Sequence, residues 1–308
     1  MIIIGAGMSG LLAGQYFRSS DNVTIWEAQP SLPNNHKALL RFRSNAVSIL
    51  TGIEFKKVNV SKSIYYEGEH FDKSSLFLNN KYSQKTTGTL RGRSISKLED
   101  CERYIAPDNF ISKVSRNLSI NYSFDAKHII HKNMKFSKEP IISTMPVKVL
   151  SDYLDYPHKL NLNSRPIWTI VCEFPNMDLD IYQTVYAIDL KGFLIDLYRA
   201  SITGNKLILE FTEEPIFDSS FDVARSIMRD LFGIVCKGEI DGKIHFQKHG
   251  KLVECGDNSV KKFLGWASSE FGIYSLGRWG THRQILMDDV VKDIEAIDKF
   301  IKSDGYIR

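Results

Sequence analysis

Residues 2–28 read IIIGAGMSGLLAGQYFRSSDNVTIWEA and decide the fold of this 308-residue chain. An apolar run at residues 2–4 ends in the glycine-rich turn GAGMSG at residues 5–10, and a helix-forming segment follows the turn. A second apolar run, residues 23–26, ends at the acidic residue Glu27. Strand, glycine turn, helix, strand and acid in this order predict a βαβ unit that binds a dinucleotide.

Each position of the turn has a physical role in that prediction. Gly5 allows the sharp turn after the strand, Gly7 lets a pyrophosphate approach the backbone, and Gly10 lets the helix pack closely on the strand. The first N–H groups of the helix, which begins around Met8 and Ser9, present partial positive charge to the phosphates. Residues 5–10 are therefore predicted to bind a cofactor.

Glu27 completes the predicted nucleotide site. It lies 17 residues after Gly10, near the spacing at which a carboxylate accepts a hydrogen bond from a ribose hydroxyl. We place Ala28, its neighbour, in the same site. NAD or NADP alone is a candidate cofactor for a unit of this kind.

Composition restricts the class of protein. Hydrophobic residues make up 43% of the chain and charged residues 25%, which is typical of a globular protein. The motif begins at Met1, which leaves no room for a leader, and no apolar run approaches the roughly 20 residues of a membrane span. We expect a cytoplasmic protein. The four cysteines form no CxxC pair, so we assign them neither a metal nor a disulfide.

The rest of the chain predicts a parallel unit with an inserted antiparallel sheet. We expect a hairpin over residues 118–136, a turn at residues 79–80, and a strand at residues 141–142 that leads through Ser143-Thr144-Met145-Pro146 into a helix. Residues 166–174 and 183–211 read as antiparallel strands, and residues 219–232 as an amphipathic helix. The predicted fold class is α/β: a Rossmann-like dinucleotide-binding domain with a smaller α+β substrate domain that contains an antiparallel sheet.

We expect the two ends of the chain to meet and complete the nucleotide domain. The strand Ile273–Leu276 leads to Gly277 and Arg278, and a final helix follows from about Met287. The predicted dinucleotide-binding domain, for which the resemblance given below implies FAD, is discontinuous and comprises residues 1–60, 118–160 and 255–308. Residues 61–117 and 161–254 form the substrate domain.

Three motifs together resemble the flavoprotein superfamily of amine oxidases and UDP-galactopyranose mutases. They are the N-terminal unit, the segment IISTMP at residues 141–146, and GRWGTHRQILMD at residues 277–288, which is similar to the mutase segment GRLGTYRYLDMD. In that superfamily the cofactor is FAD. The resemblance implies that Gly277 and Arg278 approach the cofactor and that the helix from Met287 and Asp288 points backbone N–H groups at the flavin. Two tyrosines of the mutase segment correspond to His282 and Gln284.

Further polar residues are candidates for the site. Arg41 and Arg43 share a face of a strand and can clamp a phosphate or carboxylate, or can form an ordinary solvated basic face; we predict Arg41, with Thr144, on the cofactor. Arg278 and His282 are the candidate catalytic residues. The remaining substrate-binding candidates are His36, Arg43, Tyr186, Tyr198 and Gln284, the tyrosines having half-buried packing as the alternative.

These observations predict an FAD-dependent oxidoreductase. It would oxidise a C–N (amine) or C–C bond of a small or tethered substrate by hydride transfer to the flavin. A mutase-like flavoenzyme without net redox change, acting on a nucleotide sugar, is the first alternative. A flavoenzyme that tailors a modified base in DNA is the second, suggested by Arg41, Arg43, Arg91 and Arg93. The expected partner is a small-molecule, nucleotide-linked or DNA-tethered substrate, with no metal and no membrane.

Overall fold

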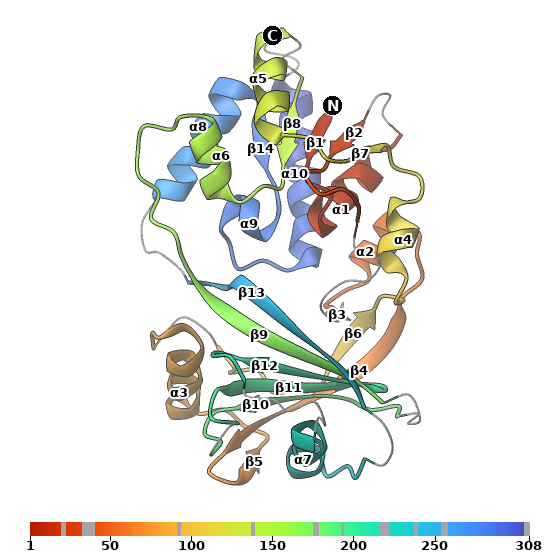
Figure 1. Ribbon diagram of the computed structural model, residues 1–308, viewed down its shortest axis with the longest axis vertical. Coiled ribbons are helices and arrows are strands. Elements are labelled where there is room, and N and C mark those ends of the chain that lie inside the picture. The colour runs from red at the N-terminus through yellow and green to blue at the C-terminus, as the bar shows by residue number, and fades with distance from the viewer. Residues whose placement is uncertain are drawn as a thin grey trace.

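The computed structural model describes residues 1–19, 23–32, 41–90, 94–136, 139–174, 179–191, 194–215, 222–236, 240–253 and 258–304. Two sheets dominate it (Figure 1): a five-stranded parallel sheet with helices on both faces in the upper part, and a strongly curved nine-stranded sheet in the lower part. This arrangement confirms the predicted fold class. No helix of the described residues is long and apolar enough to cross a membrane.

The parallel sheet joins segments that are far apart in the sequence. Its strand order is β14 (Ile273–Ser275), β8 (Ile141–Ser143), β1 (Ile2–Ile4), β2 (Thr24–Trp26) and β7 (Ile120–Asn121), and every pair is parallel. Ile3 and Ile4 of β1 pack into two different apolar clusters, one on each face. Burial on both faces is why these strands read as unbroken apolar runs rather than as alternating ones.

Helices cover both faces of this sheet. One face packs against α1 (Met8–Phe17), α2 (Ala46–Thr51), α4 (Phe110–Ser115) and α10 (Met287–Asp304). The other packs against α5 (Ala126–Phe136), α6 (Val147–Tyr153) and α8 (Ser259–Phe271). In α10 the apolar residues recur at helical spacing, so Val290, Ile294 and Ile297 face the core and the helix closes the unit.

The mixed sheet is built from the middle of the chain. Its order is β13 (Asp241–Val253), β9 (Asn163–Glu173), β12 (Lys206–Phe211), β11 (Leu197–Thr203), β10 (Tyr182–Ala187), β4 (Lys56–Tyr66), β6 (Cys101–Ile105) and β3 (Arg41–Phe42), with β5 (Glu69–Phe71) paired to β4. Only β10 and β4 pair in parallel. Helices α3 (Leu76–Thr87) and α7 (Asp222–Phe232) flank the sheet (Figure 1).

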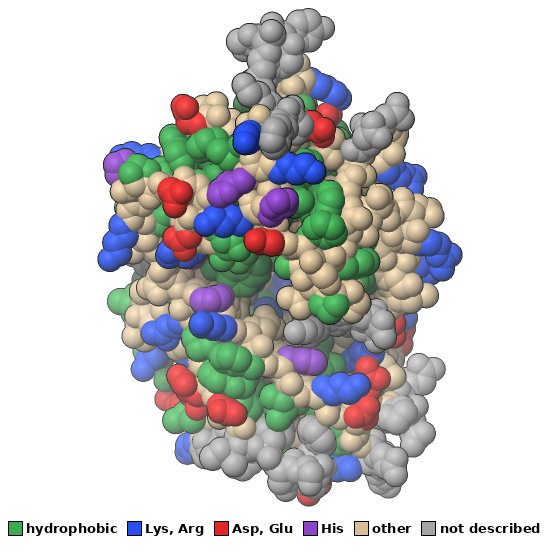
Figure 2. All heavy atoms as spheres, turned by 45° about the horizontal axis from the view of Figure 1, so that its top comes forward, with side chains coloured by type: hydrophobic (Ala, Val, Ile, Leu, Met, Phe, Trp, Pro, Cys, Tyr) green, Lys and Arg blue, Asp and Glu red, His purple; other side chains and the backbone are tan. Residues whose placement is uncertain are grey.

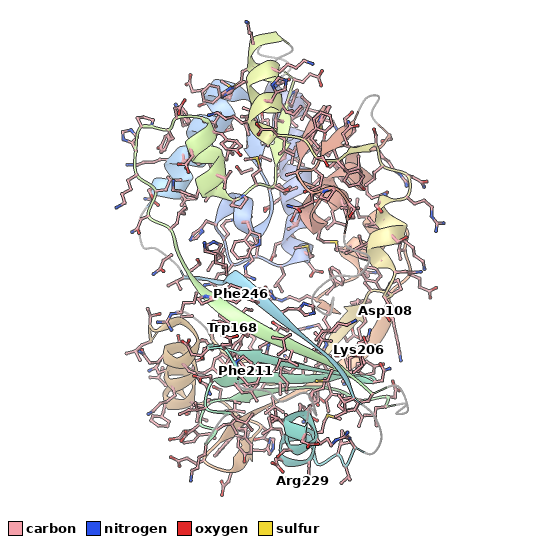
Figure 3. The ribbon with its side chains drawn as sticks, in the orientation of Figure 1. Asp108, Trp168, Lys206, Phe211, Arg229 and Phe246 are labelled. Carbon is pink, nitrogen blue, oxygen red and sulfur yellow. The ribbon has the colours of Figure 1, made fainter. Side chains whose placement is uncertain are left out.

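The two faces of the mixed sheet differ in chemistry. On β12, Leu207, Leu209 and Phe211 pack with α7 in one apolar cluster. Ile208 and Glu210, which alternate with them, line a cavity on the opposite face. Because successive strand residues point to opposite faces, a charged residue inside an apolar strand reaches the face turned toward the parallel sheet. An ion pair between Lys206 and Asp108, with Nζ and Oδ1 2.8 Å apart, ties β12 to the turn before α4 (Figure 3).

Two local predictions were wrong. Residues 118–136 form the short parallel strand β7 followed by α5, because Ile129, Ile130 and Asn133 are buried at helical spacing after Asp125 begins the helix. Residues 79–80 lie inside α3, which is capped by Ser75 and ends at Gly88. The segment after β14, for which no element was predicted, forms the short helix α9 (Gly277–Thr281). The division into domains at residues 60, 118, 160 and 255 stays a prediction.

Candidate functional site

The carboxyl ends of β1, β8 and β14 bring three sequence motifs into contact. Thr144, which follows β8, donates from its backbone N–H and from its hydroxyl to the Ile4 carbonyl oxygen, both at 2.9 Å. Gly277, which follows β14, has φ +82° and lies so close to Ser9 that a Cβ would overlap the serine side chain. Ligands of open α/β sheets bind outside these strand ends, so this edge is the candidate nucleotide site.

The glycines at positions 5, 7 and 10 are needed for different reasons. Gly5 has φ +93°, and a Cβ there would overlap the Thr144 hydroxyl; a Cβ on Gly10 would overlap the Gly5 carbonyl oxygen. Gly7 has φ −64°, is exposed, and has no atom within 4 Å of the place its Cβ would take. The fold explains Gly5 and Gly10 but not Gly7, whereas a phosphate group approaching the backbone would explain it.

The start of α1 fits an anion in the same place. Gly7 is the N-cap of α1, no side chain caps the helix, and its first turn, from Met8 and Ser9, contains no acidic residue. Such an uncapped N-terminus combines exposed N–H donors with the positive end of the helix dipole. These residues fit a diphosphate.

Glu27 lies against the glycine turn at the end of β2. Its carboxylate accepts hydrogen bonds from the backbone N–H of Ala6 at 2.6 Å and of Gln29 at 2.8 Å. Ala28, next to it, is exposed. The acidic side chain therefore stands at the end of the strand that neighbours β1, where a ribose attached to a diphosphate at the turn would lie.

Asp288 anchors the start of α10 to the segment after β3. Its carboxylate, only 8% exposed, accepts from the backbone N–H of Arg43 at 3.0 Å and from the N–H and hydroxyl of Ser44 at 2.9 and 2.6 Å. Met287 packs partly buried against the core of α1 and α10. The predicted role of the α10 backbone toward a flavin stays a prediction.

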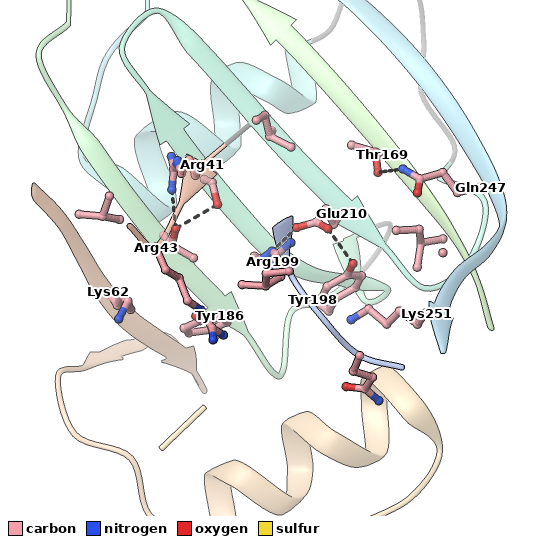
Figure 4. A pocket seen from close by; sticks show the side chains of 18 of the residues that line it. Arg41, Arg43, Lys62, Thr169, Tyr186, Tyr198, Arg199, Glu210, Gln247 and Lys251 are labelled. Carbon is pink, nitrogen blue, oxygen red and sulfur yellow. Dashed lines mark hydrogen bonds and ion pairs between the residues drawn. The ribbon is translucent and has the colours of Figure 1, made fainter. Parts of the chain in front are cut away.

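A cavity of about 680 Å³ lies between the mixed sheet and residues 284–286, which precede α10. Figure 2 shows the molecule hollowed between its two parts, and Figure 4 shows the interior. Six of the predicted site residues line it: Arg41, Arg43, Tyr186, Tyr198, Arg278 and Gln284. Its floor follows the sheet register, because Tyr186, Arg199, Glu210 and Thr169 stand opposite one another across four neighbouring strands.

The cavity lining is strongly positive. Its cationic side chains are Arg41, Arg43, Lys62, Arg103, Arg199, Lys251 and Arg278. Among the described lining residues Glu210 is the one carboxylate, so seven cations less one anion leave an excess of six positive charges. Focused in a concave site, such a charge favours anionic ligands.

Glu210 is the centre of a buried polar network. Its carboxylate pairs with Arg199 and accepts from the Tyr198 hydroxyl at 2.9 Å. Burial alone would raise the pKa of Glu210, but the charge and hydrogen bond of Arg199, with Lys251 and Tyr198, hold that pKa below its usual value. Burial alone would likewise lower the pKa of Arg199, and Glu210 raises it well above its usual value. Both groups are therefore charged at neutral pH.

Arg41 connects β3 to the centre of the mixed sheet. Its guanidinium donates to the Thr184 hydroxyl at 3.0 Å and to the Ile202 carbonyl at 2.6 Å, and it also contacts Thr203. Burial, together with the nearby charges of Arg199 and Arg103, lowers the pKa of Arg41 to about 10. The Arg41 side chain therefore forms part of the cavity wall and is held there by the sheet. In sequence it is far from the turn at Gly7.

Lys251 is placed by an irregularity in β13. The pairing register of β13 with β9 shifts between Gln247 and Lys251, and a bulge of this kind re-aims the side chains beside it. Lys251 is 5% exposed, and its ammonium lies 3.4 Å from the centroid of the Tyr198 ring. Two residues of the C-terminal motif bind the same strand: Arg278 donates to the Gly250 carbonyl and Gln284 to that of Leu252, both at 2.9 Å.

One predicted residue, His282, is not part of the cavity lining. It ends α9 with φ +48°. Burial lowers its pKa, and the nearby Arg278 and His249 lower it further against a backbone hydrogen bond at Asn163. His36 lies outside the described residues, as do Arg91 and Arg93.

Comparisons with known proteins support the fold through solved structures. No protein-family model and no curated protein sequence matches the chain. Reduced UDP-galactopyranose mutase is 14% identical over 98% of this chain and 93% of its own, with a TM-score of 0.63. A CLA-producing fatty acid isomerase from P. acnes is 10% identical over 97% of this chain and 98% of its own, with a TM-score of 0.59.

A third similar structure was solved with its ligands. Aklavinone-11 hydroxylase, in a ternary complex with FAD and aklavinone, is 9% identical over 97% of this chain and 61% of its own, with a TM-score of 0.50. At these identities the likeness establishes the fold. The chain therefore has the fold of the flavoprotein group that its motifs resemble.

Several cavity residues were not predicted. Lys62, Arg103, Glu210 and Lys251 carry no motif; the signal that could have found them is a charged residue at an alternating position of a strand whose other positions are apolar, as in KLILEF at residues 206–211. Burying a charge is costly unless it is paired or serves a ligand. Such a residue in a central strand is therefore a candidate for a site.

Proposed function

We propose that this protein is an FAD-dependent oxidoreductase that moves a hydride between a small-molecule substrate and the flavin. The observation that carries the proposal is the open space at Gly7, at the uncapped start of α1 and beside the Glu27 carboxylate. Gly7, Ser9 and the N-terminus of α1 would hold the diphosphate, and Glu27 the ribose. When bound, FAD supplies the acceptor of two electrons and a proton as hydride.

The protein's own residues would position the substrate and exclude water. The cavity borders Ile285 and Leu286, just before α10 begins, so it adjoins the helix terminus that the resemblance assigns to the flavin. The positive end of α10 would favour negative charge on a reduced flavin. Tyr186 and Tyr198 would form the aromatic floor. Arg278, held at Gly250, would close the cavity on the side of α9.

The charge of the cavity restricts which class of bond the protein would oxidise. A free amine is an ammonium ion at neutral pH, and six excess positive charges oppose its entry. The C–C branch of the proposal, or an amine that is part of an anionic molecule, is therefore preferred over a simple amine.

A mutase-like reaction on a nucleotide sugar is the second candidate. The fold likeness to reduced UDP-galactopyranose mutase, together with the anion-attracting cavity, favours it. Gln284 donates to the Leu252 carbonyl rather than standing free for a substrate, and His282 lies outside the cavity lining. The similar structures are named for a sugar nucleotide, a fatty acid and aklavinone, so a DNA-tethered substrate gains no support.

The experiment is a flavin titration of the purified protein. We expect yellow protein, or colourless protein that takes up one FAD per chain, and a G7V variant that folds but loses the flavin. Anaerobic bleaching by a substrate would identify the oxidoreductase, and furanose product from UDP-galactopyranose and chemically reduced protein would identify the mutase. Protein that refuses added FAD would contradict both.

A further inference from the structure

The positive charge of the cavity is not explained by the proposed cofactor. None of residues 5–10 lines the cavity, so a diphosphate at the glycine turn would lie outside it. An isoalloxazine ring reaching the cavity is neutral when oxidised and carries at most one negative charge when reduced. At least five of the excess positive charges are therefore not balanced by the cofactor.

Three of the cavity cations, Arg41, Arg43 and Lys62, lie around one region of the sheet. The hydroxyl of Thr184 on β10 accepts from Arg41, and Thr184 stands opposite Lys62 of β4 and Ser201 of β11 in the strand register. Figure 4 shows Lys62, Arg43 and Tyr186 together on one side of the cavity. Like charges in a shared site repel one another, so a cluster of this kind is stable only with an anion or open water among its members.

Two members of the group are available to a ligand. The Lys62 ammonium donates to a backbone carbonyl, that of Glu99, and has no ion pair in the described part of the chain. The structure gives the Arg43 guanidinium no hydrogen bond or ion pair with a described residue, while the Arg43 backbone is fixed by Asp288. Arg199 is paired with Glu210, and Arg41 is bound to the sheet. Arg41 and Arg199 would therefore contribute positive charge to the site without binding the ligand directly.

We propose that the substrate carries a phosphate group, as a monoester or a diphosphate, and that Arg43 and Lys62 bind it against the Thr184 side of the cavity. A single carboxylate would balance one charge, whereas a phosphate monoester brings about two and offers three oxygens. Guanidinium groups bind such oxygens in bidentate geometry and lysine as a point charge. This proposal rests on the proposed flavoenzyme function, since it assigns the rest of the substrate to the flavin end of the cavity.

The test uses the FAD-loaded protein, so that the glycine turn is already filled. Inorganic phosphate, pyrophosphate and, as a non-phosphorylated dianion, oxalate are titrated by calorimetry while the flavin spectrum is followed. We expect phosphate or pyrophosphate to bind at least about tenfold more tightly than oxalate, with an affinity that falls as salt rises. The double variant R43M/K62M should lose about tenfold or more, since two charge-assisted hydrogen bonds are removed.

A matched control lies on the same strand. Lys57 of β4 points to the other face of the sheet and pairs with the exposed Glu102, so K57M should bind all three anions as the unmodified protein does. Retained FAD and an unchanged melting temperature show that R43M/K62M is folded. Pyrophosphate affinity that is equal to that of oxalate, or equal in R43M/K62M and K57M, overturns the phosphate proposal alone. Failure to take up FAD overturns the proposed function instead.

Discussion

The parallel sheet and the mixed sheet carry their candidate chemistry in different ways. In the parallel unit the strands are apolar on both faces, and the functional groups lie in the turns after them: Gly7, Glu27, Thr144 and Gly277. In the mixed sheet the ion-paired charges stand within the strands instead. Glu210 alternates with Leu209 and Phe211 of the apolar cluster beneath, and Arg199 stands opposite it on β11.

The difference is one of energy. A turn at a strand end is solvated, so a glycine or a carboxylate there costs little and can be selected for a ligand. A charge in a central strand loses its hydration. It is tolerated only when interactions with a partner offset the free energy of desolvation. The mixed sheet should therefore be sensitive to loss of a charge, and the parallel unit to added volume.

The largest effect should come from Glu210→Ala. The substitution removes the carboxylate partner of the Arg199 guanidinium at a largely buried site, which costs about 3–5 kcal/mol of unfolding free energy. Chemical denaturation at neutral pH measures it. Because the pKa of Glu210 is lowered in the fold, the carboxylate stabilises the protein above its unfolded pKa and loses that contribution as pH falls through the folded pKa. The deficit of the variant should shrink in acid.

Glu102→Ala is the matched control for that experiment. Glu102 pairs with Lys57 on the surface, and both side chains are more than half exposed. Surface pairs of this kind contribute at most about 1 kcal/mol. Equal losses in the two variants would refute the view that the buried network, rather than ion pairing in general, stabilises the mixed sheet.

The same contrast explains what could be predicted from the sequence. The glycine turn, Glu27 and the Gly277 segment could be predicted as site candidates because a turn of fixed length imposes a fixed spacing on the sequence. Lys62 and Lys251 were missed because their neighbourhood is created by strand pairing over long separations, and for Lys251 by a register shift. The helix over residues 126–136 was missed because its alternation continues that of β7, while its burial follows a helical period.

Two single-methyl substitutions in the turn should separate fold from ligand. In Gly10→Ala the new Cβ overlaps the Gly5 carbonyl oxygen, which is backbone and cannot turn away. We expect a loss of about 1–3 kcal/mol in unfolding free energy, as for other overpacked sites. In Gly7→Ala nothing is displaced, so its stability should change by about 1 kcal/mol or less.

The affinity for FAD should rank these variants differently. Gly7→Ala places its methyl group where the diphosphate would approach, so it should weaken FAD binding by about tenfold, or about 1.4 kcal/mol, as measured by flavin titration at constant fold. A Gly7→Ala protein that binds FAD normally would refute the assignment of that space to a phosphate. Destabilisation of Gly7→Ala to the level of Gly10→Ala would show that Gly7 is also required by the fold.

The smallest expected effect concerns Lys85, a half-buried cation of the mixed-sheet part that is not among the residues lining the cavity. From α3 its ammonium donates to the carbonyl oxygens of Ala187, Ile188 and Leu197 at 3.3, 3.0 and 2.7 Å, and so ties the end of β10 to the start of β11.

Burial lowers the pKa of Lys85 to about 8, against the raising effects of Asp196 and Asp189. Above that pH the folded protein releases a proton that the unfolded chain still holds, so unfolding free energy should rise with pH. The gain is about 1 kcal/mol between about pH 8 and about pH 9. Denaturation of the unmodified protein and of Lys85→Met across this range isolates the term, because the other titrating groups are common to both. If the difference in unfolding free energy between the two proteins does not change with pH, the three carbonyl partners offset the cost of burying the ammonium. Burial of a charge would then be tolerated in this part of the protein without an acidic partner.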